Sequence, residues 1–162
     1  MLKITYRGRK KDYAFDRLRE ACFQCSVCSL HCVVQDLEEF DAKHTFVYDL
    51  FSSDEPHRHS ALWACSGCHK CYEVCPQDVN PARVIENLRE ESFEAGSAPG
   101  YVYDQVELML ETGMSFPVTK KTVKDREKLG LAEPKKGPVE DIRKIFEKTG
   151  LMQKLEKRRK GS

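Results

Sequence analysis

The chain has 162 residues, of which 40% are hydrophobic and 33% are charged, and its formal net charge is +1. A chain of this length fits one domain with a short extension, and the balanced charge argues against a nucleic-acid partner. No apolar run approaches the ~18 residues of a membrane span, and the first six residues, MLKITY, lack a signal-peptide core. We therefore expect a globular, cytoplasmic protein with a modest core and no direct membrane span.

The N-terminal segment, residues 1–14, contains an alternating stretch at residues 2–6 that fits one short strand. A cysteine run follows, with Cys22, Cys25, Cys28 and Cys32 in the spacing C-x2-C-x2-C-x3-C. Valine follows this run in place of a proline that would fix a turn. We therefore expect the chain to continue past Cys32 in another conformation, and a helix fits.

The next part of the chain joins the first cysteine run to a second one. Residues 33–40 and 54–64 lack the alternation of strands, and both stretches fit helices, the second leading directly into Cys65. The second run has the same spacing, with Cys65, Cys68, Cys71 and Cys75, and Pro76 follows it. Together the two runs hold all eight cysteines of the chain.

Three helices are predicted after the second run. The first begins at Pro81 with Asn80 as its N-cap and closes at Gly96. The second covers residues 101–112 and stops at Gly113. The third begins near Pro138, carries acidic residues in its first turn and ends at Gly150. Their partial apolar faces hold Val84, Ile85, Leu88, Phe93, Val102, Val106, Met109, Leu110, Ile142, Ile145 and Phe146. The whole is predicted to be mostly α.

The last residues, 154–162, form a basic tail that contains Lys157, Arg158, Arg159 and Lys160. A solvated tail is the simpler interpretation of such a charge run, and a surface that binds polyanions is the alternative.

The cysteine runs admit three kinds of chemistry. Disulfides are disfavoured, because cysteines three residues apart bridge only with strain and the cytoplasm keeps thiols reduced. Zinc sites are usually built from two distant C-x2-C pairs, so the third cysteine in each run is surplus for zinc. A [4Fe–4S] cluster fits best, since a short loop can wrap three of its irons while the fourth iron takes a distant ligand.

The double run resembles the bacterial ferredoxin pattern, in which the fourth cysteine of each run ligates the cluster of the other run. This resemblance implies one cluster held by Cys22, Cys25, Cys28 and Cys75, and another held by Cys65, Cys68, Cys71 and Cys32. Small residues within the runs, Ser26, Ser29, Ser66 and Gly67, are expected to let backbone N–H groups approach the cluster sulfides. His69 and Lys70 are expected to raise the potential of the second cluster.

Set among helices, the eight cysteines resemble the α-helical ferredoxin fold, and in particular the C subunit of heterodisulfide reductase. The stretches that carry this resemblance are the first run, Trp63 to Pro76, Lys128 to Leu131 and Ile142 to Leu151. The resemblance implies two [4Fe–4S] clusters that relay electrons between a flavin/iron–sulfur subunit and a thiol/disulfide catalytic subunit. A dimer of the whole complex is a further expectation.

The chain is expected to divide into four parts, and other functions are possible. We expect an N-terminal segment at 1–14, a two-cluster domain at 15–97, a helical extension at 98–153 and the tail at 154–162. Residues 75–82 also resemble the iron–sulfur subunit of succinate dehydrogenase and fumarate reductase, but too few residues precede Cys22 for the further cluster domain of those proteins. A redox-sensing module is a third possibility. No residue is assigned a catalytic role, since every cysteine is already used.

Overall fold

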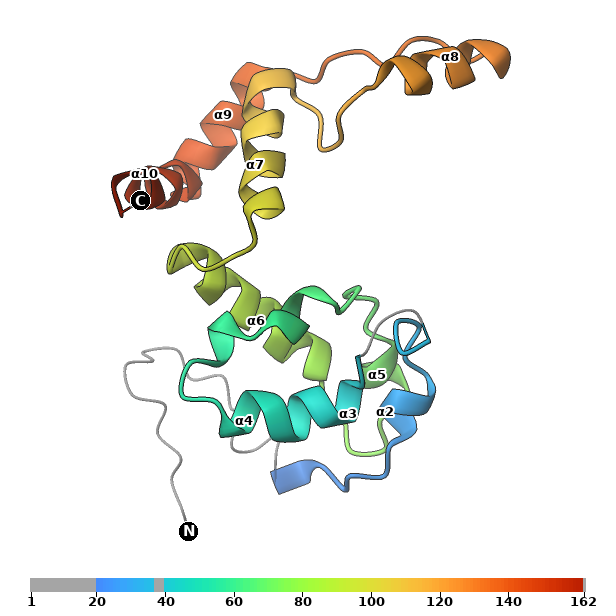
Figure 1. The fold of residues 1–162 in the computed structure, drawn as a ribbon, viewed down its shortest axis with the longest axis vertical. Coiled ribbons are helices and arrows are strands. Elements are labelled where there is room, and N and C mark those ends of the chain that lie inside the picture. Colours follow the sequence, from blue (N-terminus) through green and yellow to red (C-terminus); the bar gives the residue numbers. More distant parts are fainter. Residues whose placement is uncertain (1–19, 37–39, 162) are drawn as a thin grey trace. The chain divides into compact units, whose positions relative to one another are not determined.

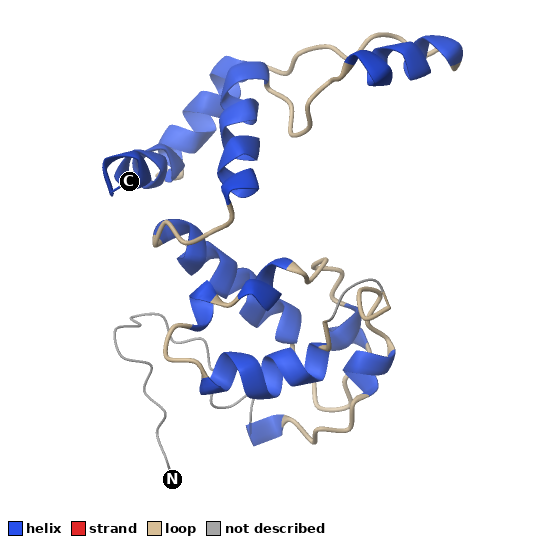
Figure 2. Ribbon diagram, in the orientation of Figure 1, coloured by secondary structure: helices blue, strands red, loops and turns tan. Residues whose placement is uncertain are grey.

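The structure is a computed structural model that describes residues 20–36 and 40–161. These residues form helices and turns and contain no strand, as Figure 2 shows. The mostly α prediction is therefore confirmed for the described part of the chain. The short strand predicted at residues 2–6 lies outside the described residues. The chain divides into two compact units, residues 1–97 and 98–162, and each is described by itself.

The first unit is built from short helical elements and one long helix (Figure 1). In chain order they are α2 (Val27–Leu30), α3 (Ala42–His44), the π-helical turn η1 (Thr45–Asp49), α4 (Leu50–Ser52), the 3₁₀ turns η2 (Pro56–Arg58) and η3 (Ser60–Trp63), α5 (Lys70–Glu73) and α6 (Pro81–Glu94). Helices α3, η1 and α4 follow one another without a break, so residues 42–52 form one helical rod with a wider turn in its middle.

The core of this unit lies between the rod and α6. Phe46 and Leu50 of the rod are buried, as are Ile85 and Leu88 of α6 and Leu62 of η3. Each such side chain contributes about 1.5–3 kcal/mol when it is fully buried. Several cysteines, among them Cys22, Cys28 and Cys65, pack partly buried against this cluster. Both cysteine runs therefore pack against this core.

Helix α6 confirms the predicted start and end. The Asn80 side-chain oxygen accepts a hydrogen bond from the Arg83 N–H at 3.0 Å, and Pro81 is the first helical residue. Gly96 beyond its end has a φ of 73°, which a side chain would disfavour. The cap fixes the residue at which α6 begins, and the apolar face of the helix packs against the core.

The prediction of helix was only partly right for the two stretches that join the runs. Residues 33–36 form turns, and residues 37–39 are not described. Residues 54–64 contain the short turns η2 and η3 in place of a continuous α-helix. The interruption lies between the two turns at His59, whose φ of −69° and ψ of 129° are extended.

The second unit contains α7 (Gly100–Thr112), α8 (Lys120–Lys128), α9 (Val139–Lys148) and α10 (Leu151–Gly161). The predicted helices at 101–112 and 138–150 are confirmed as α7 and α9, with Gly113 and Gly150 at positive φ beyond their ends. Helix α9 packs against both α7 and α10, and Phe146 of α9 is buried.

Two features of the second unit differ from the predictions. Helix α8 was not predicted, since it carries no buried residue and therefore no apolar stripe. No helix was predicted in the basic tail, but residues 151–161 form helix α10. Within the described residues, no helix has the length and apolar character that crossing a membrane requires.

Candidate metal centre

The two cysteine runs fold into the same local backbone. Gln24 and Gly67, each just before the second cysteine of its run, have φ values of 54° and 68°. Ser26 and His69, each just after that cysteine, have φ values of 65° and 58°. A one-turn helix then begins in each run, α2 after Ser26 and α5 after His69. The equal spacing of the cysteines therefore reflects a repeated structural unit.

The left-handed residues are costly, which points to a function for this backbone. A left-handed conformation costs about 1–2 kcal/mol for a residue with a side chain. The described residues contain four such non-glycine positions, Gln24, Ser26, His69 and Asp78, and all lie within or just after a cysteine run. Strain of this kind gathers at functional sites. The turns also direct N–H groups toward sulfur: Gly67 donates to Cys65 Sγ at 3.4 Å, and Val79 donates to Cys75 Sγ at 3.3 Å.

The first cysteine run lines a cavity together with the last cysteine of the second run. This cavity has about 430 Å³ of empty space, including the part that is open to solvent. Its lining contains Cys22, Cys25, Cys28, Cys71 and Cys75. The rest of the described lining is largely apolar, with Lys43 as its one charged residue. Cys75 thus lies with the first run although it follows that run by more than forty residues.

The second run lines another cavity, of about 370 Å³ including its open part. Its lining contains Cys65, Cys68 and Cys71 together with Cys32, the last cysteine of the first run. Cys71 and Pro81 belong to the linings of both cavities. The two cavities are therefore neighbours, separated by the thickness of these side chains.

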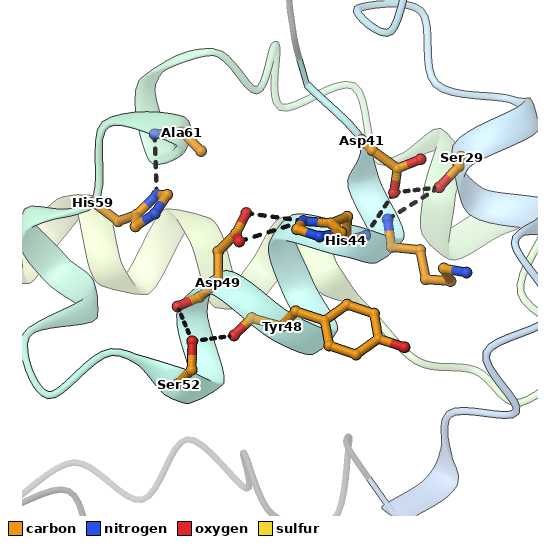
Figure 3. Close-up of polar contacts among 9 residues, drawn as sticks. Ser29, Asp41, His44, Tyr48, Asp49, Ser52, His59 and Ala61 are labelled. Atoms are coloured by element: carbon orange, nitrogen blue, oxygen red, sulfur yellow. Dashed lines mark hydrogen bonds and ion pairs between the residues drawn. The ribbon is translucent and has the colours of Figure 1, made fainter.

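Polar contacts hold the first run to helix α3, as Figure 3 shows. The Ser29 hydroxyl donates to Asp41 Oδ1 at 2.9 Å and accepts from the Lys43 N–H at 3.1 Å. The same Asp41 oxygen accepts from the His44 N–H and so caps α3. Lys43 Nζ donates to the Ser26 hydroxyl at 2.9 Å. Sequence reasoning treats Ser26 and Ser29 only as small residues, and it misses their bonds to α3.

The same figure shows a second polar group farther along the rod. His44 Nδ1 lies 3.3 Å from Asp49 Oδ1, a pairing across the π-helical turn. The Ser52 hydroxyl donates to the Tyr48 carbonyl at 2.7 Å. The Ala61 N–H donates to His59 Nδ1 at 3.3 Å and so caps η3. These contacts stabilise the ends of short helices and involve no cysteine.

Side chains of helix α6 hold the second run in place. Arg89 Nε donates to the Leu62 carbonyl at 2.7 Å, and its guanidinium also donates to the Cys65 carbonyl. His69 Nε2 lies 2.8 Å from Glu86 Oε1. Partial burial acts to raise the pKa of Glu86, but the hydrogen bonds and charges of His69 and Arg83 outweigh it and hold that pKa below its ordinary value. No sequence pattern links these helix residues to the cysteines.

The thiols differ in how readily they ionise. Burial raises the pKa of Cys28 and Cys65, and it raises the pKa of Cys71 to about 11. The pKa of the exposed Cys68 is instead held below its ordinary value, because the Lys70 backbone and the Ser66 side chain donate hydrogen bonds to it. Buried thiolates next to one another need positive charge close by, which the irons of a cluster held by these cysteines would supply.

The donor set of both cavities fits an iron–sulfur group. Their described linings offer thiols and no carboxylate, and soft thiolate donors select iron–sulfur clusters, zinc or copper. All eight cysteines are free. Among residues 20–36 and 40–161, no group of three or more His, Cys, Asp or Glu side chains is arranged as a site for a metal ion.

Comparison with known proteins identifies the domain around the cysteines. Residues 19–79 match the family described as a 4Fe-4S dicluster domain. This match covers both runs together with the segment that joins them. The chain therefore carries an iron–sulfur domain, and the α-helical ferredoxin prediction is confirmed at the level of its fold.

Curated relatives extend the similarity beyond that domain. The C2 subunit of the H(2)/formate:CoB-CoM heterodisulfide,ferredoxin reductase of Methanococcus maripaludis is 27% identical over 74% of this chain and 64% of its own length. An iron-sulfur C subunit of the CoB--CoM heterodisulfide reductase of Methanocaldococcus jannaschii is 29% identical over 74% of this chain and 63% of its own length. The chain thus spans a little under two thirds of these relatives.

A third relative has a different name. The B subunit of a fumarate reductase (CoM/CoB) of Methanothermobacter marburgensis is 29% identical over 67% of this chain, but the match covers only 25% of that protein. The shared part is therefore a quarter of a longer protein.

Proposed function

This chain is a relative of the iron–sulfur C subunits of heterodisulfide reductases, and we propose that it is the electron-transfer subunit of a heterodisulfide reductase-like complex. Two [4Fe–4S] clusters supply one-electron chemistry when they are bound. In this proposal the chain relays electrons between a flavin/iron–sulfur subunit and a thiol/disulfide catalytic subunit. The observation that carries the proposal is the gathering of eight cysteines around two neighbouring cavities.

We assign the cysteines to the clusters in the crossed pattern. Cys22, Cys25 and Cys28 with Cys75 hold the first cluster, and Cys65, Cys68 and Cys71 with Cys32 hold the second. The cavity linings support this assignment, since each contains three cysteines of one run and the last cysteine of the other. Cys71 borders both cavities. The crossed pattern therefore joins the two sites into one unit.

The protein around these cysteines has three tasks in the proposal. Apolar side chains such as Phe46 and Val79 line the first cavity and keep water from it. The Gly67 and Val79 N–H groups donate to cysteine sulfur, and bonds of this kind tune the potential of an iron–sulfur site. The exposed Cys25 and Cys68 place one edge of each site at the surface, where a partner's redox centre can approach.

A second candidate function is favoured by one comparison. The relative named as a B subunit of a fumarate reductase (CoM/CoB) is similar to this chain over 67% of the chain's length. The alternative is therefore an electron-transfer subunit of a succinate/fumarate-type or other respiratory dehydrogenase. It differs from the main proposal in the partner subunit, and the partner is what the experiment must identify.

The test is anaerobic purification of the affinity-tagged chain from its native host. We expect it to co-purify with a flavin-containing subunit and with a second cysteine-rich subunit. The isolated complex should reduce a heterodisulfide substrate with a reduced flavin-subunit donor. The Cys28→Ser variant should retain the partner subunits but lose electron flow between them, because one ligand of the first site is missing.

A different set of partners would contradict the proposal. Co-purification with a succinate-oxidising or fumarate-reducing flavoprotein would favour the alternative function. A chain that purifies alone from the native host, with both sites loaded, would contradict both functions.

A further inference from the structure

The side chain of Arg89, on helix α6, reaches the backbone of the second cysteine run. It lies 24 residues after Cys65, yet its guanidinium donates to the Cys65 carbonyl. Its Nε donates to the Leu62 carbonyl at 2.7 Å, and its Cζ lies 5.5 Å from the centre of the Trp63 ring. Three contacts from one half-buried side chain thus fix the segment that leads into the second run.

The charges around the two sites differ chiefly by this residue. Each cavity has one lysine in its described lining, Lys43 in the first and Lys70 in the second. The carboxylate of Asp41 bonds to Ser29 of the first run. At the second run, the charge of Glu86 faces both His69 and Arg83. The hydrogen bonds of the Arg89 guanidinium go to carbonyl groups, and among the described residues it forms no ion pair with a carboxylate.

We propose that Arg89 is a positioning residue that holds the second cysteine run in place and sets the potential of the second cluster above that of the first. This inference rests on the proposed function, since it presumes that both sites carry clusters. As a consequence, an electron prefers one of the two clusters. Electrons that enter the protein are held preferentially at the site of Cys65, Cys68, Cys71 and Cys32.

The physical cause is the fixed positive charge. A guanidinium keeps its charge at every pH at which the protein is folded. A cluster gains negative charge on reduction, so a positive charge in a partly dry environment favours the reduced state. The Arg89 guanidinium donates to the carbonyl of Cys65, so its charge lies beside a ligand of the second cluster.

The test is a redox titration of the full-length, cluster-loaded protein followed by EPR. The Arg89→Gln variant removes the charge, and Arg89→Lys keeps it while losing the forked geometry. Arg58→Gln is the charge-matched control, since Arg58 is exposed and pairs with Glu55. The Cys68→Ser variant identifies the signals of the second cluster. Trp63 is the single tryptophan of the chain, so its fluorescence reports whether the stacking contact is kept.

We expect Arg89→Gln to lower the midpoint of the second cluster and to leave the first unchanged. At a fixed potential the ratio of reduced to oxidised second cluster should fall about tenfold, which corresponds to about 59 mV for a one-electron couple. Arg89→Lys should keep the midpoint potential of the second cluster close to that of the unmodified protein, but it should alter Trp63 fluorescence. Arg58→Gln should change neither. Selective loss of the second cluster in Arg89→Gln, with about four irons left, would support the positioning role.

Two results would overturn the inference. One is an Arg89→Gln protein with both clusters and unchanged midpoints, and the other is an equal shift of both midpoints. An unmodified protein that holds no iron–sulfur cluster would instead refute the proposed function, before any variant is compared. The two failures are thus distinguishable.

Discussion

Ser29 lies between Cys28 and Cys32, and its side chain is buried. Its hydroxyl donates to Asp41 and accepts from the Lys43 N–H. The Ser29→Ala variant would leave both partners without this bond, and an unsatisfied buried group costs about 1–3 kcal/mol. We therefore expect the free energy of unfolding to fall by about this amount in an anaerobic urea titration.

Ser52→Ala is the matched control for that variant. Ser52 is exposed, and its hydroxyl bonds to backbone carbonyls of its own helical rod. Its loss should change the free energy of unfolding by less than about 0.5 kcal/mol. Equal effects of the two substitutions would contradict the account of Ser29.

The crossed assignment of the cysteines is tested by exchanging single ligands. Cys75 lies in the first cavity, so Cys75→Ser should perturb the EPR signal of the first cluster. Cys32 lies in the second cavity, so Cys32→Ser should perturb the second signal, the one that Cys68→Ser also changes. The reverse pattern, with each run's last cysteine affecting its own run, would contradict the crossing.

The scale of the element shows why sequence patterns located some helices and not others. Helix α6 carries a side-chain N-cap, and α6, α7 and α9 all have an apolar face and a glycine at or just beyond their end. These local signals predicted them with ends close to those observed. Helix α8 has Val123 as its one apolar residue and no buried residue, so it lacks the periodicity on which such a prediction depends.

The same limit applies to the candidate site. The cysteines could be identified because their spacing is itself the signal. The contacts of Arg89 with Leu62 and Cys65 depend on how α6 packs against η3, which no local pattern encodes. Four positions of the two runs have a left-handed backbone, and a glycine in the sequence marks only one of them, Gly67. The other three are Gln24, Ser26 and His69, whose residue types do not predict a positive φ.

The end of α7 provides a test at the element scale. Gly113 has a φ of 71°, and a Cβ there would lie 2.6 Å from the Gly137 Cα. The Gly137 N–H donates to the Thr112 carbonyl at 3.2 Å, so neither backbone can move away freely. Gly113→Ala should therefore combine the conformational cost of about 1–2 kcal/mol with a steric clash, and lower the thermal midpoint of the second unit.

Gly130→Ala separates these two costs. Gly130 has a φ of 66°, but nothing lies within 4 Å of the position of its Cβ. Only the conformational cost of about 1–2 kcal/mol remains. A Gly113→Ala protein as stable as Gly130→Ala, compared by thermal unfolding, would contradict the close contact.

At the scale of the whole molecule, the cysteines all lie in the unit of residues 1–97. The second unit has large apolar side chains at its surface, among them Phe116, which is 73% exposed, and Leu131. Exposed apolar side chains of this kind are candidates for docking a partner. The limits predicted for the domains stay a prediction.

A truncation after Ser97 tests whether the first unit holds the clusters without the second unit, and whether the second unit docks the partner subunits. Because every proposed ligand lies before this point, the truncated chain should retain about eight irons, measured after anaerobic purification. Co-purification of the partner subunits should be lost if the second unit docks them. Loss of iron on truncation would show that the second unit also stabilises the sites.

The central claim is that this chain holds two [4Fe–4S] clusters and passes electrons between them. The most direct measurement is iron and acid-labile sulfide per chain on anaerobically purified protein, with EPR of the dithionite-reduced sample. The account predicts about eight of each and signals of two interacting clusters. About two zinc ions per chain, with no sulfide, would contradict it and leave a structural zinc protein.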